Sequence, residues 1–162
     1  MSATQQPAST PAPAPTPAPT IRNAGTVPVT PRKLFVNIPV GDLQRSIEFF
    51  EALGFTFNPH FTDATATCML VGEDAYFMLI TRERFATFSG RPVDVTRPVD
   101  VSYAITVESR EAVDEMIGKV VAAGGSEVGD PQDHGFMFQR SFHDLDGHHW
   151  EVFWMDPSAV PG

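Results

Sequence analysis

The apolar residues from Lys33 onward follow a pattern that occurs twice along the chain. An alternating run at 33–40 predicts a strand, because successive strand residues face opposite sides of a sheet. A helix is expected next, since Asp42 can cap its first turn, Gly54 can end it, and the apolar residues between them recur at helical spacing. Three short apolar runs then predict strands, at 55–62, 66–72 and 75–82.

The second copy begins with the alternating run 101–107 and continues with a helix that Ser109 can cap and Gly124 can end. Three further strand candidates follow, at 126–131, 136–144 and 148–156. The sequence therefore predicts an α+β fold of two tandem βαβββ modules, each with one helix covering one sheet. The spacing alone does not give the strand topology.

Composition sets the domain boundaries. Residues 1–31 are rich in Pro, Ala and Thr, which predicts an extended or disordered tail to which we assign no function. The tail lacks the basic start and apolar segment of a secretory signal. The domain is predicted to span 32–157, with its halves at 33–90 and 100–157, and the Pro-, Gly- and Asp-rich segment 85–100 is expected to link them. Residues 158–162 form a short second tail.

The charge of the predicted domain excludes some partners. All 20 acidic residues of the chain lie after Lys33, and 2 of the 11 basic residues, Arg22 and Arg32, precede it, so the net charge from Lys33 onward is −11. Nucleic acid and anionic membranes require a basic face and are not expected as partners. Cys68 is the only cysteine, which excludes an internal disulfide and paired-cysteine zinc sites and favours the reducing cytoplasm.

Histidines and carboxylates gather near the end of the domain in "SFHDLDGHHWEVFW". His149 and Glu151 would share one face of a strand, and with His143, and His60 or His134 from other strands, they could hold a divalent metal such as Zn, Fe, Ni or Mn. The alternative is that these histidines are hydrogen-bonding residues at the start of a strand, with no metal. We favour no cofactor.

Two stretches, "VNIPVGDLQRSIEFFEALGF" and "SFHDLDGHHWEVFW", resemble the motifs of the vicinal oxygen chelate superfamily, which includes glyoxalase I, extradiol dioxygenases and the glyoxalase/bleomycin resistance proteins. In the second stretch Leu145 stands where the family usually has Pro. The resemblance covers residues 33–157. It implies that the two modules curve into a cup that receives a small molecule, and that two chains form a homodimer.

The resemblance also implies four positions for metal ligands, on the first, fourth, fifth and eighth strands. In this chain they are Phe35, Met78, Ser102 and Glu151. A phenyl ring, a thioether and a neutral hydroxyl are unsuited to the metals that such sites hold. These substitutions argue against lactoylglutathione lyase activity and against ring-opening dioxygenase chemistry.

Strand alternation, applied to the implied cup, predicts a mostly apolar lining with a few polar groups. The predicted ligand-binding residues are Phe35, Asn37, Tyr76, Met78, Ser102, Thr106, Arg140 and Phe153, and the candidate catalytic residues are Glu151 and His149. Arg140 is the cation expected to reach the cup, either for an anionic ligand group or to neutralise Glu151. The alternative for the whole set is a filled core between the sheets.

Two functions remain open at this point. The first is a bleomycin resistance-like protein that binds a small, largely apolar or aromatic molecule. The second is a lyase, isomerase or dioxygenase-like enzyme, in which an apolar environment turns Glu151 into a general base or a relocated metal site acts. A purely structural module tethered by its tail is a third hypothesis, supported only by the tail.

Overall fold

The computed structural model describes residues 32–94 and 101–159. The chain divides into residues 1–31 and residues 32–162, and the fold described here belongs to the second unit. The predicted tail at 1–31 lies outside the described residues. So do part of the predicted linker and the last residues of the second tail.

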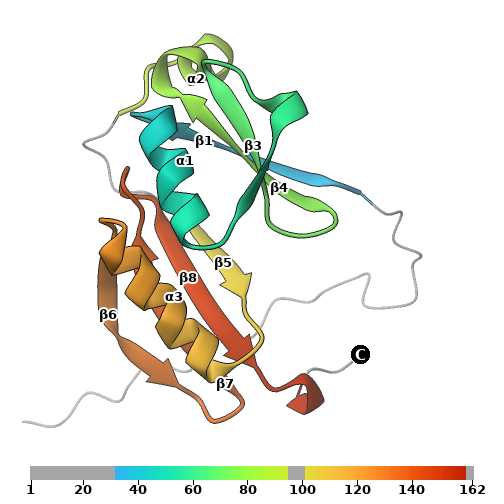
Figure 1. Ribbon diagram of the computed structural model, residues 1–162, viewed down its shortest axis with the longest axis vertical. Coiled ribbons are helices and arrows are strands. Elements are labelled where there is room, and N and C mark those ends of the chain that lie inside the picture. Colours follow the sequence, from blue (N-terminus) through green and yellow to red (C-terminus); the bar gives the residue numbers. More distant parts are fainter. Residues whose placement is uncertain (1–31, 95–100, 160–162) are drawn as a thin grey trace, which may run out of the picture. The chain divides into compact units, whose positions relative to one another are not determined.

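In both halves a strand is followed by a helix and then by three more strands (Figure 1). The first half has an additional helix, α2 (Arg82–Ser89), after its last strand. The first half contains β1 (Leu34–Val40), α1 (Leu43–Ala52), β2 (Thr56–Asn58), the 3-10 turn η1 (Pro59–Phe61), β3 (Ala66–Leu70), β4 (Ala75–Thr81) and α2 (Arg82–Ser89). The second half contains β5 (Ser102–Thr106), α3 (Arg110–Ala122), β6 (Ser126–Asp133), β7 (Met137–His143), β8 (His149–Met155) and the 3-10 turn η2 (Pro157–Ala159).

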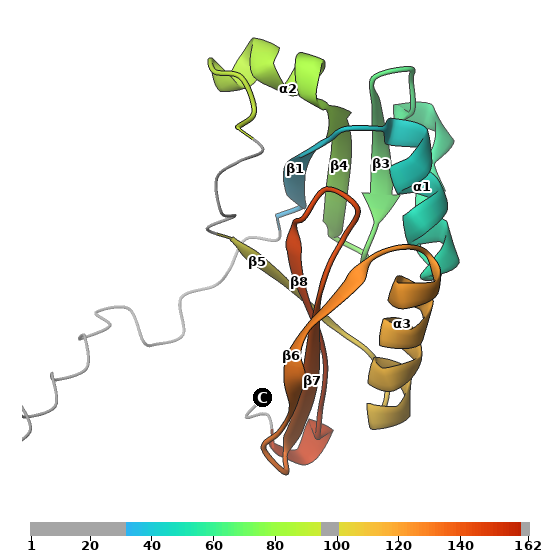
Figure 2. The same ribbon diagram turned by 90° about the vertical axis from the view of Figure 1, so that its left-hand side faces the viewer.

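Each half forms its own curved four-stranded sheet. The strand orders are β1-β4-β3-β2 and β5-β8-β7-β6, so the first strand of each half pairs with its last strand. These two pairings, β1 with β4 and β5 with β8, are parallel, and the others are antiparallel. Helices α1 and α3 lie on the same side of the two sheets (Figure 2). The predicted α+β fold of two βαβββ modules is confirmed.

The predicted helix ends are also observed. Asp42 accepts a hydrogen bond from the backbone N–H of Arg45 at 3.0 Å, and Ser109 caps α3 in the same way. Gly54 and Gly124 adopt positive φ angles of 100° and 95° just beyond the helices, a conformation that costs glycine little. The N-cap residues and the C-terminal glycines were therefore sufficient to locate both helices in the sequence.

Two elements differ from the expectation. Residues 82–89 form α2, capped by the Thr81 side chain, whereas the sequence predicted a strand up to residue 82 and a linker from residue 85. This helix is polar and buries none of its residues, so it lacks the apolar stripe that predicts a helix. The predicted strand at 55–62 is cut short after Asn58, where Pro59 begins η1. Proline has no N–H to donate to a sheet.

The core lies between the helices and the sheets and is continuous across the two halves. Trp150 on β8 is fully buried, and its ring contacts Phe50 on α1 and Phe77 on β4, with ring centroids 5.4 Å and 4.8 Å apart. Val152, two residues further along β8, is also buried against the helices. The residues that alternate with them on β8 face the opposite side. We call this helix-free side of the two sheets the open face.

Candidate functional site

Strand register places most of the predicted ligand-binding residues next to one another on the open face. On the first sheet Phe35 is paired with Tyr76, and Asn37 is paired with Met78. On the second sheet the pairs are Ser102 with His149, and Thr106 with Phe153. The side chains of Phe35, Asn37, Ser102 and Thr106 are exposed, so the filled core that was the alternative is absent at these positions.

An aromatic pair marks the part of the open face on the first sheet. The rings of Phe35 and Tyr76 stack with their centroids 4.8 Å apart and their planes 16° apart. Phe35 nevertheless remains 50% exposed. A large apolar ring that is ordered by a neighbour and still faces solvent provides a surface for a flat ligand.

Lys33 borders this pair. Its Nζ atom donates a hydrogen bond of 3.2 Å to the hydroxyl of Tyr76 and lies 3.5 Å from the carboxylate of Asp74. The hydrogen bond with Tyr76 is the main cause of a raised pKa of Lys33, and the contact with Asp74 raises this pKa further. The Tyr76 hydroxyl in turn donates to the backbone carbonyl of Glu73 at 2.6 Å. The ammonium is therefore balanced by a carboxylate of its own half.

A polar cluster occupies the open face of the second sheet. Ser102 on β5 donates a hydrogen bond of 2.9 Å from Oγ to Oε1 of Glu151 on β8. His149 Nε2 lies 3.8 Å from the same oxygen, and the rings of His143 and His149 are 5.4 Å apart. The Glu151 side chain is 31% exposed. The expected desolvation of Glu151 is therefore only partial.

Aromatic contacts on the helix side join the two sheets. The ring of Phe77 on β4 lies 5.0 Å from that of Tyr103 on β5 and 4.8 Å from that of Trp150 on β8. Successive strand residues point to opposite faces. The residues that flank these three rings along their strands therefore face the open side of their own sheets: Tyr76 and Met78 on the first, and Ser102, Ala104, His149 and Glu151 on the second.

The prediction that Arg140 reaches the cup is wrong. Arg140 shares a strand face with the buried Phe142 and points toward α3, where its guanidinium donates to Asp114 at 2.6 Å. It also donates from Nε to Glu127 at 2.9 Å. The open face of β7 instead presents Ser141, whose register partner is Glu151. The alternation of β7 relative to Phe142 would have shown this, because a buried ring marks the helix side.

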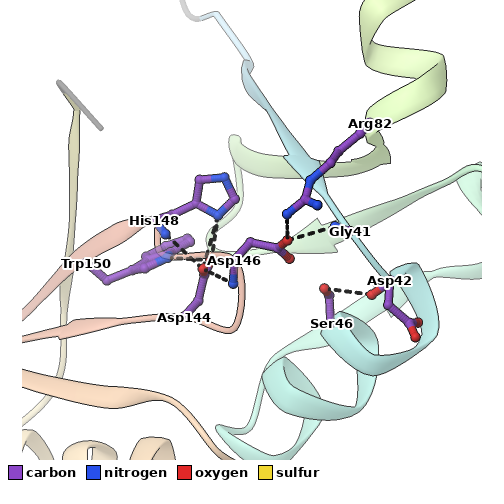
Figure 3. A network of polar contacts seen from close by, with 8 residues as sticks. All are labelled: Gly41, Asp42, Ser46, Arg82, Asp144, Asp146, His148 and Trp150. Carbon is purple, nitrogen blue, oxygen red and sulfur yellow. Dashed lines mark hydrogen bonds and ion pairs between the residues drawn. The ribbon is translucent and has the colours of Figure 1, made fainter. Parts of the chain in front are cut away.

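A buried network behind the polar cluster was not predicted (Figure 3). Asp144, 7% exposed, accepts hydrogen bonds from the backbone N–H groups of Asp146 and His148 and from the indole N–H of Trp150 at 3.1 Å. His148 Nδ1 lies 2.9 Å from Oδ2 of Asp144, within hydrogen-bonding distance. The network fixes the β7–β8 turn and the start of β8, the strand that carries Glu151.

The same turn is tied to the first half by Asp146 (Figure 3). Its Oδ1 accepts hydrogen bonds from the backbone N–H of Gly41 at 2.8 Å and from Nη2 of Arg82 at 2.6 Å. A shallow polar groove of about 290 Å³ lies beside these contacts, lined by Gly41, Asp42, Arg45, Ser46, Arg82, Leu145 and Asp146. In the sequence this "DLDG" stretch is part of the motif that resembles the family, and its spacing carries no signal of a contact with the other half.

Within residues 32–94 and 101–159, no group of three or more His, Cys, Asp or Glu side chains is arranged to hold a metal ion. His60 lies in η1, and His134 packs against Phe136 with ring centroids 6.5 Å apart. His149 and Glu151 therefore have no third ligand of these types among the described residues. Among the described residues, no helix is both long enough and apolar enough to span a membrane.

Comparison with known proteins supports the predicted resemblance. Residues 32–72 match the family model described as bleomycin resistance protein-like N-terminal. No curated protein sequence matches the chain. The chain has the fold of the vicinal oxygen chelate superfamily.

Three solved structures illustrate the similarity. The hypothetical protein SA1046 from S. aureus is 29% identical, with a TM-score of 0.68 over 78% of this chain and 95% of its own. A glyoxalase/bleomycin resistance protein/dioxygenase family enzyme from Burkholderia phytofirmans PsJN is 15% identical, with a TM-score of 0.66 over 75% and 96%. The fosfomycin resistance protein FosX from Listeria monocytogenes is 14% identical, with a TM-score of 0.60 over 80% and 98%. The last two share the fold.

Proposed function

We propose that this protein binds a small, largely apolar or aromatic molecule on the open face of its two sheets. The half-exposed Phe35 ring, stacked on Tyr76, is the observation that carries the proposal. The hydroxyl of Ser102 and the carboxylate of Glu151 lie on the open face of the second sheet and would supply the polar contacts. An apolar surface with a few convergent polar groups is the common composition of small-molecule sites.

We further propose that binding needs no metal. The four positions that would hold one in this fold family carry Phe35, Met78, Ser102 and Glu151, a donor set that does not fit a divalent ion. The only carboxylate among them is engaged by the Ser102 hydroxyl. Lactoylglutathione lyase chemistry is accordingly not part of the proposal.

The alternative of a lyase, isomerase or dioxygenase-like enzyme depends on Glu151 acting as a base. A base of that kind needs an environment that disfavours its charge. Glu151 is 31% exposed, so solvent reaches its carboxylate, which also accepts a hydrogen bond from Ser102. The binding function is therefore the better supported of the two.

A homodimer belongs to the proposal for a physical reason. Sites for small molecules usually bury 70–90% of the ligand surface, whereas Phe35, Asn37, Ser102 and Thr106 are all exposed in the single chain. A second chain over the open face would enclose the ligand. Light scattering on the eluting protein, with and without a bound probe, measures the mass directly, and a monomer in both states would exclude this part of the proposal.

The binding proposal is tested by fluorescence titration with the neutral aromatic probe N-phenyl-1-naphthylamine. Losing the contact of one phenyl ring should weaken binding about 10-fold or more in Phe35→Ala. Phe136→Ala is the matched control, because Phe136 is 51% exposed and lies in the β6–β7 hairpin. Equal effects of the two substitutions, or no saturable binding by the unmodified protein, would overturn the proposal.

A further inference from the structure

We infer that helix α2 is a lid over one end of the first sheet, and that its opening uncovers a further apolar row of the open face. The inference goes beyond the proposed function, because it concerns how much of this face a ligand can reach. It follows from the burial of the open-face residues and from the contacts that hold α2.

Strand register arranges the open-face residues of β1, β4 and β3 in three successive rows. These rows are Phe35–Tyr76, Asn37–Met78–Cys68 and Pro39–Ile80–Ala66. Burial rises from the first row to the third. Phe35 is half-exposed, whereas Cys68 is 2% exposed and Ile80 is 5% exposed. The open face is free of α1 and α3, yet its third row is covered.

The core between the helices and the sheets does not account for this burial. Ile80, Ala66 and Cys68 are all buried, but none of them belongs to the core cluster, which contains their strand neighbours Leu79 and Met69. An element on the open side must therefore cover Ile80. Helix α2 begins two residues after Ile80 and packs against β1 and β4, and it extends from the end of β4 away from α1 (Figure 2).

The apolar contacts of α2 are few. None of its residues is buried, Phe85 is only partly buried, and Phe88, whose ring lies 5.1 Å from that of Phe85, is exposed. Elements with few buried apolar contacts open at a small part of the free energy of global unfolding. We therefore expect α2 to leave the sheet while the rest of the domain stays folded.

Two arginines hold α2 with different strength. Arg82, its first residue, is bonded to the largely buried carboxylate of Asp146. Arg84 donates from Nη1 to Asp63 at 2.8 Å and to Thr65 at 2.6 Å, in the loop between η1 and β3. The side chains of Arg84 and Asp63 are 46% and 59% exposed, so water and salt compete for this contact. The helix is thus fixed at its first residue and weakly held beyond it, as a hinged lid requires.

Cys68 reports the opening, because it is the only cysteine of the chain and lies buried in the row beside Ile80. The full chain is treated with 5,5′-dithiobis(2-nitrobenzoate) without denaturant, and the rate follows the population of the open form. Arg84→Gln should raise this rate about 3-fold, the effect of losing one exposed ion pair. Roughly 1 M NaCl should raise it similarly in the unmodified protein and less in Arg84→Gln.

Arg110→Gln is the matched control, because it removes an arginine–aspartate ion pair from the second half. It should leave the rate unchanged. Equal acceleration by Arg84→Gln and Arg110→Gln would show that the thiol is reached by unfolding of the whole domain and would overturn the lid. So would a rate that equals the rate of global unfolding extrapolated from urea.

A second thiol position keeps the test decisive, because η1 also packs against β3, the strand of Cys68. Ile80→Cys in a Cys68→Ala background places the only thiol in the third row itself, and Arg84→Gln should accelerate its reaction as well. Acceleration at position 80 alone supports the lid and limits the uncovered surface to the third row. No acceleration at either position would overturn it. The test uses no ligand, so its failure leaves the proposed binding function standing, and failure of N-phenyl-1-naphthylamine to bind leaves the lid standing.

Discussion

Arg82, the first residue of α2, donates a hydrogen bond of 2.6 Å from Nη2 to Oδ1 of Asp146 in the β7–β8 turn, 64 positions away. The Asp146 side chain is only 10% exposed, and the same oxygen accepts from the backbone N–H of Gly41. The contact joins the two halves of the fold at the turn that leads into β8. The orientation of the two parts of the open face therefore depends in part on one carboxylate.

Replacing Asp146 should destabilise the protein more than replacing an exposed carboxylate. Asp146→Ala leaves the Gly41 N–H and the guanidinium of Arg82 without their acceptor, and Nε of Arg82 is already buried without a partner. We expect a loss of about 1–3 kcal/mol in the free energy of unfolding, measured with urea. Asp74→Ala, which removes an ion pair whose side chains are 57% and 60% exposed, should cost about 0.5 kcal/mol or less. Equal losses of stability in the two variants would show that the contact between the halves stabilises the protein no more than an exposed ion pair does.

Asp144→Ala should have a larger effect, because the carboxylate of Asp144 accepts from three buried or half-buried N–H groups and contacts the ring of His148. Unsatisfied buried donors cost about 1–3 kcal/mol each, so we expect a total loss of about 3 kcal/mol or more. Asp144→Asn keeps the volume and one acceptor oxygen and should lose less. A loss of under about 1 kcal/mol in Asp144→Ala would contradict the network as drawn.

Asp133 provides a prediction about pH. Hydrogen bonds from the Arg110 guanidinium and then from the Gly135 N–H lower its pKa from 3.8 to about 2. Since the pKa is lower in the folded state, the stabilisation by Asp133 is present above pH 3.8 and is lost as the pH falls toward 2. The difference in the free energy of unfolding between the unmodified protein and Asp133→Asn should therefore be constant from pH 7 to about 5. Below about pH 5 this difference should decrease toward zero. In an Arg110→Gln background most of this pH dependence should vanish. A difference that stays constant down to about pH 2 would contradict the assignment.

The parts of the fold that follow local rules were predictable from sequence. Asp42 and Gly54 act on the backbone within a few residues of themselves, so the helix between them could be located from the sequence alone. Alternation along β8 placed Trp150 in the core and Glu151 on the open face, because the period of a strand is fixed by its geometry. The open-face residues of β1 and β5 followed from the same rule.

Features that depend on tertiary contacts were not predictable in this way. Arg140 was placed on the wrong face because the alternation of β7 was not anchored at the buried Phe142, and its partner Asp114, 26 positions away on α3, gave no signal in the sequence. The bonds from Asp146 to the first half have separations of 64 and 105 positions and no sequence signature. Helix α2 was missed because no apolar stripe marks it, and only its cap at Thr81 gave a local signal.

The pairing of the first strand with the last in each half constrains the order in which the protein is assembled during synthesis. Strand β5 has β8 as its only neighbour in the sheet, and Ser102 meets Glu151 across 49 positions. When β5 leaves the ribosome, its partner has not yet been translated, and the edges of β5 remain available to chaperones or to other nascent chains until β8 emerges. The strand that carries Glu151 is thus the one that closes the second sheet, so the polar cluster of the open face forms at the same moment as the fold itself.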